Sequence, residues 1–194
     1  MRPDETLVNQ ALAGDLRAFE ALVDRHRDVV FRVAARIVGT DEAEDVAQDS
    51  FLRAFHRLSQ FRGRSTFRTW LLRITHNASL DALAKRRATP IDQPDEEAAD
   101  RGSDDWPQRT PADALEVSER RARLSQKLQL MRPPHRAVLV LRDLEGLSYE
   151  QIATVTEAPL GSVKGRLHRA RQELIEILRA NTYDWELPRA DDPN

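Results

Sequence analysis

The stretch that most constrains the fold is residues 147–172, with the sequence LSYEQIATVTEAPLGSVKGRLHRARQ. Ser148 is a good N-cap, and Gln151, three residues later, completes a capping box that would start a short helix. Pro159 is tolerated in a first helical turn, because its missing N–H group would have no partner there. The stretch therefore predicts two short helices joined by a tight turn.

The second of these helices is expected to bury one side. Its apolar residues recur at helical spacing, at Val163, Leu167, Ala170 and Leu174. The opposite side is polar and basic. Such a pair is typical of a helix-turn-helix, whose second helix enters the major groove of DNA. An ordinary helical hairpin with a solvated basic face is the alternative interpretation.

The composition favours helices and argues against several kinds of protein. Of 194 residues, 32% are charged and 7 are glycine, which favours an all-α fold. The absence of cysteine excludes disulfides and thiolate sites, and the five histidines lack ligand spacing, so we expect no metal. No P-loop or G-x-S-x-G motif indicates an enzyme. With no transmembrane run or signal-peptide pattern, we expect a cytoplasmic location.

The net charge of −2 conceals a strong segregation along the chain. Residues 88–114 hold eight acidic groups, two basic groups and four prolines, and they lack apolar periodicity. This segment is predicted to be an extended or disordered linker. It separates two basic blocks, so we predict two helical domains, 1–87 and 115–182, joined by a flexible acidic linker and followed by an acidic tail, 183–194.

Apolar spacing and cap residues predict the remaining helices. In order, these are residues 4–13, 16–38, 41–58, 66–87, 114–131 and 133–146. The third is expected to carry Ala54 and Phe55 inward. Its acidic opening, residues 41–49, suits a helix N-terminus. A solvated acidic face and a protein-docking surface are the two interpretations of this opening.

A basic block follows, with aromatic and arginine residues alternating in residues 61–67. Residues 62–87 hold seven basic groups against one acid, Asp81. This composition favours a surface that stacks unpaired bases and neutralises phosphates. For any single aromatic residue, a place in the core is the alternative that we favour.

Four segments of the chain resemble the extracytoplasmic-function (ECF) sigma factors, in the minimal two-domain form of that family. They are DEAEDVAQDSFLRAF, FRGRSTFRTWLLRITHN, LRDLEGLSYEQIA and PLGSVKGRLHRARQEL, in the family's order and spacing. The resemblance implies region 2 within residues 1–87 and region 4 within 115–182. It also implies a non-enzymatic factor without a cofactor. Such a factor binds the RNA polymerase core, recognises the −10 and −35 promoter elements and helps to melt DNA.

The resemblance assigns two sites to the first domain. One is a surface that docks on the clamp helices of the polymerase β′ subunit: Asp45, Gln48, Asp49, Phe51 and Leu52. The other is the −10 site: Arg62, Ser65, Thr66, Trp70, Ile74 and Asn77. The last three match positions that wall a pocket for a flipped base, where stacking and hydrogen bonds repay the cost of extrusion. Asp81 departs from the family pattern, so the preference for a downstream base stays open.

The resemblance assigns the −35 site to the helix-turn-helix. Its expected residues are Arg142, Pro159, Gly161, Ser162, Lys164, Gly165, His168 and Arg169. Lys164 can donate to guanine, and Arg169 to a base or a phosphate. Glu157 stands where such a turn often has glycine, so the turn is expected to differ in detail.

The resemblance also implies further partners. These are the polymerase β flap and an anti-sigma factor, with no membrane insertion of this chain. The acidic linker resembles a spacer that threads the polymerase cleft, and a solvated tether is its alternative. A self-sufficient helix-turn-helix regulator, whose first domain binds a ligand or dimerises, is the competing hypothesis for the whole chain.

Overall fold

The structure is a computed structural model that describes residues 3–88 and 123–180. The predicted linker from residue 89 onward, the first part of the predicted helix 114–131 and the acidic tail lie outside the described residues. Within those two ranges the regular structure is helical, without strands, as the sequence predicts. None of the described helices combines the length and apolar character that a membrane span requires.

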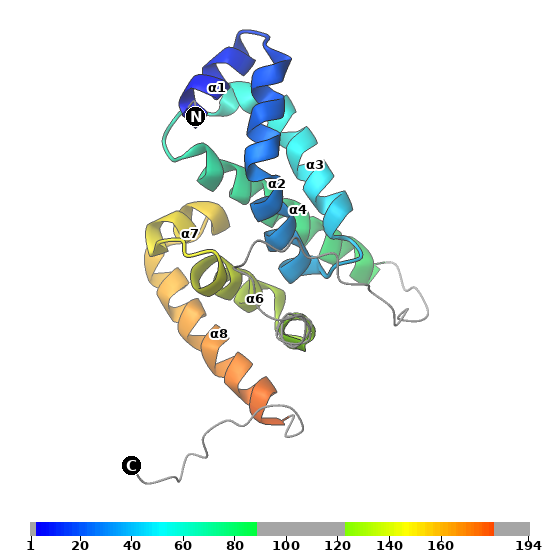
Figure 1. Ribbon diagram of the computed structural model, residues 1–194. Coiled ribbons are helices and arrows are strands. Elements are labelled where there is room, and N and C mark those ends of the chain that lie inside the picture. The colour runs from blue at the N-terminus through cyan, green and yellow to red at the C-terminus, as the bar shows by residue number, and fades with distance from the viewer. Residues whose placement is uncertain (1–2, 89–122, 181–194) are drawn as a thin grey trace, which may run out of the picture.

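The N-terminal module (residues 3–88) contains four α-helices (Figure 1). They are α1 (Asp4–Leu12), α2 (Leu16–Val38), α3 (Ala43–His56) and α4 (Phe67–Ala88), with a short 3-10 turn, η1 (Leu58–Gln60), before α4. Asp15 caps α2 by accepting the N–H of Arg17 at 3.0 Å. The prediction for α3 is wrong by two residues. The helix begins at Ala43, because the Ala43 N–H closes a turn onto the Thr40 carbonyl.

The core of this module is aliphatic at its centre and aromatic at one end. Leu22, Val30 and Leu71 are fully buried between α2 and α4. Phe61 and Phe67 contact Trp70 at ring-centroid distances of 5.4 and 5.7 Å. Such tilted aromatic contacts stabilise a core beyond their buried area. The loop before α4 is thereby anchored to the helix that it introduces.

The C-terminal module (residues 123–180) follows the predicted helix-turn-helix closely. Residues 123–130 are helical, and then come α6 (Pro133–Leu139), η2 (Val140–Leu144), α7 (Tyr149–Thr156) and α8 (Leu160–Ala180). The capping box of Ser148 and Gln151 is confirmed, with both of its hydrogen bonds present. The expected regular helix to residue 146 is wrong in its last turns. These form a π-helix, in which the Glu145 N–H reaches back five residues to the Val140 carbonyl.

The turn between α7 and α8 depends on a residue with left-handed backbone geometry. Glu157 has φ 51° and ψ 37°, a conformation that a non-glycine residue seldom adopts. Val163, Leu167 and Ala170 of α8 are buried, as predicted, while Leu174 is partly buried. The opposite face of α8 is left to solvent.

The two modules pack against each other, which the sequence did not predict. In Figure 1, α7 lies beside α4, and α6 with η2 lies beside α2. One buried apolar cluster includes Val33 and Ile37 of α2 together with Val140 of η2 and Val155 of α7. The modules therefore share a continuous core in this conformation.

Candidate nucleic-acid interface

The exposed face of α8 presents most of the residues predicted to bind the −35 element. Pro159, Gly161, Ser162, Lys164, His168 and Arg169 are exposed, and Gly165 is half-buried. They share this face because the helical period turns Val163 and Leu167 into the core. This face therefore presents cationic and hydroxyl groups that do not belong to the core.

The predicted Arg142 lies beside this face, in η2. Its Nη1 donates to the Leu147 carbonyl at 2.6 Å, and its guanidinium stands 4.8 Å from the centre of the Tyr149 ring. The Lys164 ammonium lies 5.8 Å from the same ring. Tyr149 thus orients two cations. Sequence reasoning missed it, although an aromatic residue directly after the N-cap Ser148 was a usable signal.

The residues predicted to bind the −10 element fall into two groups. Arg62, Thr66 and Asn77 are exposed, and Ser65 is half-buried. Thr66 caps α4, since its Oγ1 accepts the N–H of Thr69 at 3.2 Å. These residues surround the start and one side of α4.

Trp70 and Ile74 form the second group, and both belong to the core. Each is 6% exposed. Trp70 packs against the rings of Phe61 and Phe67. A flipped base therefore has no direct access to the faces of these two side chains in this conformation. Of the two interpretations, a place in the core is the one that fits them in this structure.

The C-terminal module covers another side of α4. Arg73 is paired with Glu157 at 3.3 Å. His76 is buried, and its Nδ1 lies 3.1 Å from the Asn77 side-chain oxygen. Burial lowers the pKa of His76 below its usual value, although its hydrogen bond with Asn77 favours the charged form. The nearby Arg166 lowers it further, and Glu157 opposes that effect.

A buried cation, Arg136, lies near the contact between the two modules. Arg136 of α6 is 2% exposed and donates to the Leu128 carbonyl and the Gln129 side chain. Burial lowers its pKa to about 10, and the positive charges of Arg86 and Arg87 act in the same direction. It stays charged at neutral pH. The packing of the modules therefore places Arg136 of the C-terminal module near Arg86 and Arg87 of the N-terminal module, and their positive charges repel one another.

The exposed face of α3 carries the predicted polymerase-docking residues. Asp45, Gln48 and Leu52 are exposed, Leu52 to 54%, and Phe51 is half-buried. The prediction that Phe55 points inward is wrong. It is 43% exposed, because the helical period that buries Ala54 turns the next position outward.

One arginine joins this face to α4. Arg53 is paired with Asp49 and with Asp81, each at 2.8 Å. Hydrogen bonds to these carboxylates, with Asp81 contributing most, raise the pKa of Arg53. Asp81, which departs from the family pattern, thus has a structural partner.

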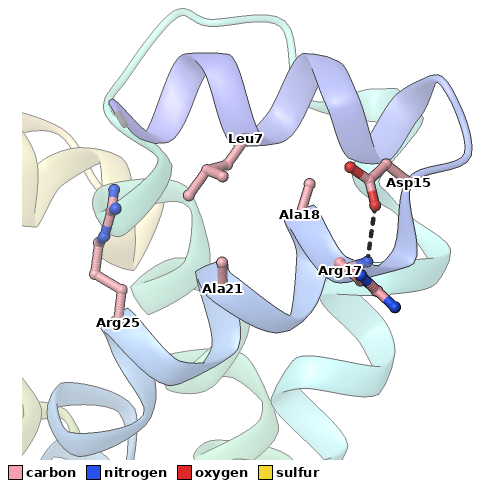
Figure 2. Close-up of a pocket in the computed structure, with 6 residues that line it drawn as sticks. All are labelled: Leu7, Asp15, Arg17, Ala18, Ala21 and Arg25. Atoms are coloured by element: carbon pink, nitrogen blue, oxygen red, sulfur yellow. Dashed lines mark hydrogen bonds between the residues drawn. The ribbon is translucent and has the colours of Figure 1, made fainter. Parts of the chain in front are cut away.

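Two hollows lie away from the predicted DNA-binding residues. One, of about 330 Å³, is lined by Leu7, Asp15, Arg17, Ala18, Ala21 and Arg25 where α1 crosses α2 (Figure 2). The other, of about 350 Å³, is an apolar groove of the C-terminal module, lined by Leu124, Leu128, Leu139, Asp143, Leu144, Arg171, Leu174 and Ile175. The groove is the better candidate for docking an apolar protein segment, because its walls are largely leucine and isoleucine.

Family models match both modules. Sigma-70 region 2 matches residues 22–89, and Sigma-70 region 4 matches residues 121–174. Two relatives are similar over nearly the whole chain. The RNA polymerase sigma-H factor of Pseudomonas aeruginosa is 37% identical over 181 residues, covering 91% of this chain and 94% of that protein. The ECF RNA polymerase sigma-E factor of Haemophilus influenzae is 34% identical over 177 residues, covering 89% and 93%.

Solved structures have the same architecture. CnrH, in its complex with the cytosolic domain of CnrY, superposes with a TM-score of 0.65 at 31% identity, covering 92% of this chain and 99% of that one. The sigma factor RpoE of Bartonella quintana, in complex with the anti-sigma factor NepR, gives a TM-score of 0.61 at 23% identity and supports the fold.

Proposed function

The chain belongs to the ECF group of the sigma-70 family, and from this premise we propose that it binds the RNA polymerase core and directs it to promoters with a −10 and a −35 element. One observation carries the proposal. Two separate elements, α4 and α8, each combine a buried apolar side with a cationic or amide-bearing side. Such a pair suits recognition of two stretches of one DNA molecule.

The helix α8 is proposed to bind the −35 element in the major groove. Lys164, His168 and Arg169 lie on its exposed face. The cationic side chains are suited to guanine O6 and N7 or to phosphates. The exposed residues Gly161 and Ser162 lie in the first turn of the helix, ahead of the bond from the Val163 N–H to the Pro159 carbonyl, and their N–H groups are suited to a backbone phosphate.

The start of α4 is proposed to hold the unpaired −10 strand. Arg62 and Thr66 are exposed before and at its cap, and Asn77 is exposed further along. An amide offers both a donor and an acceptor to a base edge. Stacking on Trp70 requires the aromatic cluster to open, because that ring is buried. Capture of displaced bases would shift the melting equilibrium without ATP.

Two surfaces are proposed to contact the polymerase. The face of α3 with Asp45, Gln48 and Leu52 combines acidic and apolar groups and suits the β′ clamp helices. The apolar groove of the C-terminal module suits a segment of the β flap. RNA synthesis then belongs to the polymerase, and this chain acts in the cytoplasm as a specificity factor without its own catalytic activity.

We also propose control by an anti-sigma factor. CnrH is bound by the cytosolic domain of CnrY in the solved complex, and its 31% identity extends over 92% of this chain. A protein of that kind would cover the surfaces that the polymerase and DNA need.

Run-off transcription tests the proposal. Purified core polymerase is mixed with this chain and genomic DNA fragments, and the start sites are mapped. We expect new start sites that depend on the added chain and share two upstream elements. Absence of core binding and of start-site selection would contradict the proposal, and tight binding of the free chain to palindromic duplexes would indicate a self-sufficient regulator instead.

A further inference from the structure

Three arginines of the N-terminal module surround one carboxylate of the C-terminal module. Arg32 Nε and Nη2 lie 3.3 Å from the two carboxylate oxygens of Glu145, and Arg36 Nη1 lies 2.9 Å from one of them. Arg68 Nη2 is 3.5 Å from Glu145 Oε2 and also from its main-chain oxygen. The Glu145 side chain is 4% exposed, whereas the three arginine side chains are 31–49% exposed. A partner from the other module therefore occupies the centre of this cluster.

The local backbone explains how Glu145 reaches the cluster. It follows the widened π-turn η2 and precedes Gly146, whose φ is 71°. Single π-turns within helices are rare and are frequent at functional positions. The turn ends α6 and η2 against α2 and aims the carboxylate across the seam.

The three arginines have the chemistry of an anion site. Guanidinium groups bind carboxylates and phosphates with similar geometry. Arg68 is on the first turn of α4, next to Thr66 and Trp70 of the predicted −10 site. Arg32 and Arg36 add two positive charges from α2. A DNA backbone phosphate beside the start of α4 would find there the ligands that Glu145 now uses.

The closed packing is incompatible with simultaneous contacts to both promoter elements. Elements centred at −10 and −35 are about 25 base pairs apart, or about 85 Å along the duplex at about 3.4 Å per base pair. In the structure α7 contacts α4 directly, so the helix-turn-helix lies against the helix proposed to hold the −10 strand. The modules must separate before both surfaces engage.

We propose that Glu145 is a built-in competitor of DNA: it fills the site of Arg32, Arg36 and Arg68, keeps the free chain closed, and yields that site to a backbone phosphate in the promoter complex. The inference rests on the proposed function, because it assigns a regulation to the proposed −10 surface. Separation exposes an anion site of three charges and, in the same step, uncovers the side of α4 that α7 contacts. This closure depends on residues of this chain alone and needs no inhibitor protein.

Charge reversal at Glu145 provides the test. Glu145→Lys places a cation among the three arginines, and Asp143→Lys makes the same charge change two residues earlier. Asp143 is a matched control, because it is paired with Arg171 inside the C-terminal module, at 2.6 Å. Glu145→Gln serves as the mild variant. Thermal unfolding followed by circular dichroism verifies that each variant is folded.

Two readouts are compared on the full-length free chain. The chain has no cysteine, so dyes on Ala84→Cys of α4 and Thr154→Cys of α7, both exposed, report the distance between the modules by energy transfer. Fluorescence anisotropy with a short mixed-sequence single-stranded DNA reports phosphate binding without knowledge of the promoter. We expect Glu145→Lys to lower the energy transfer and to raise the DNA affinity about tenfold above that of Asp143→Lys at low salt.

A variant on the other side of the contact sharpens the test. Arg36→Gln should also lower the energy transfer, but it should reduce DNA affinity, because it removes part of the phosphate site. Equal energy transfer in Glu145→Lys and Asp143→Lys would refute the proposal that Glu145 keeps the free chain closed. If Glu145→Lys opens but binds DNA no more tightly than the control, the proposed competition between Glu145 and a DNA phosphate is refuted. Loss of transcription in the wild-type chain would instead refute the proposed function, while these binding readouts would still stand.

Discussion

The two proposed DNA-contacting surfaces differ in what else their residues do. On α8, Lys164, His168 and Arg169 face solvent and have no part in the core. On α4, Trp70 and Ile74 are core residues, and neighbouring side chains are covered by the C-terminal module. The proposed contacts of α8 are exposed in the free chain, whereas Trp70 and Ile74 would become accessible only if the aromatic cluster opened. The two proposed surfaces therefore differ in accessibility: α8 offers exposed cationic side chains, while α4 combines the exposed Asn77 with the buried Trp70 and Ile74.

The largest expected difference between the two surfaces is in stability. Trp70→Ala removes a buried ring from the aromatic cluster and should lower the free energy of unfolding by about 3–5 kcal/mol. His168→Ala removes an exposed side chain and should change it by less than about 0.5 kcal/mol. Urea unfolding followed by circular dichroism measures both. Equal stability of the two variants would contradict the placement of Trp70 in the core.

The second difference is in sequence recognition. Lys164→Ala and Arg169→Ala should each weaken −35-dependent binding by the polymerase holoenzyme by about 1–3 kcal/mol if they contact bases. Arg179→Ala is the matched control, since it removes an exposed cation from the last turn of the same helix. Transcription from promoters with an intact or altered −35 element measures the effect. A −35 preference unchanged in both variants would remove α8 from recognition.

A third prediction concerns the scaffold under α8. Ser148→Ala removes one half of the capping box at the start of α7 and should lower the free energy of unfolding by about 1 kcal/mol. The exposed Thr154 of the same helix gives the control Thr154→Ala. Urea midpoints of the two variants are compared. If Ser148→Ala were as stable as its control, the cap would have no role in presenting the exposed surface.

The smallest expected effect is a pH dependence confined to the covered surface. The pKa of His76 is lowered in the folded chain, so the unfolded chain binds more protons there as the pH falls below about 6.5. Stability should therefore decrease on acidification and return above that pH. The difference between wild type and His76→Gln, measured by urea unfolding across this range, isolates the effect of this group, which lies near Glu157 and Arg166. An identical pH profile in the two proteins would refute it.

Local sequence rules predicted most of the individual helices. Asp15 and Ser148 are caps that act through their nearest neighbours, so their hydrogen bonds follow from spacing alone. The burial of Val163 and Leu167 follows from helical period. The exposed residues of α8 are predictable for the same reason, since they lie opposite that apolar stripe.

Local sequence rules could not predict the contacts between the modules. Glu145 and Arg36 are 109 residues apart in sequence, and no periodic pattern relates them. No spacing or propensity rule predicts the π-turn that precedes Glu145. Phe55 was misplaced because its apolar character suggested burial, whereas the structure leaves it exposed beside Leu52. Long-range packing and exposed apolar side chains thus mark the limits of sequence reasoning here.

The distance between the two modules distinguishes a closed free chain from an open promoter-bound chain. The chain labelled at Ala84→Cys and Thr154→Cys is measured alone, with core polymerase, and with core polymerase and promoter DNA. We predict high energy transfer in the free chain, because α7 packs on α4, and a large decrease once polymerase and promoter are bound. Low energy transfer in the free chain, or high energy transfer maintained in the promoter complex, would show that the modules do not separate on promoter binding as proposed.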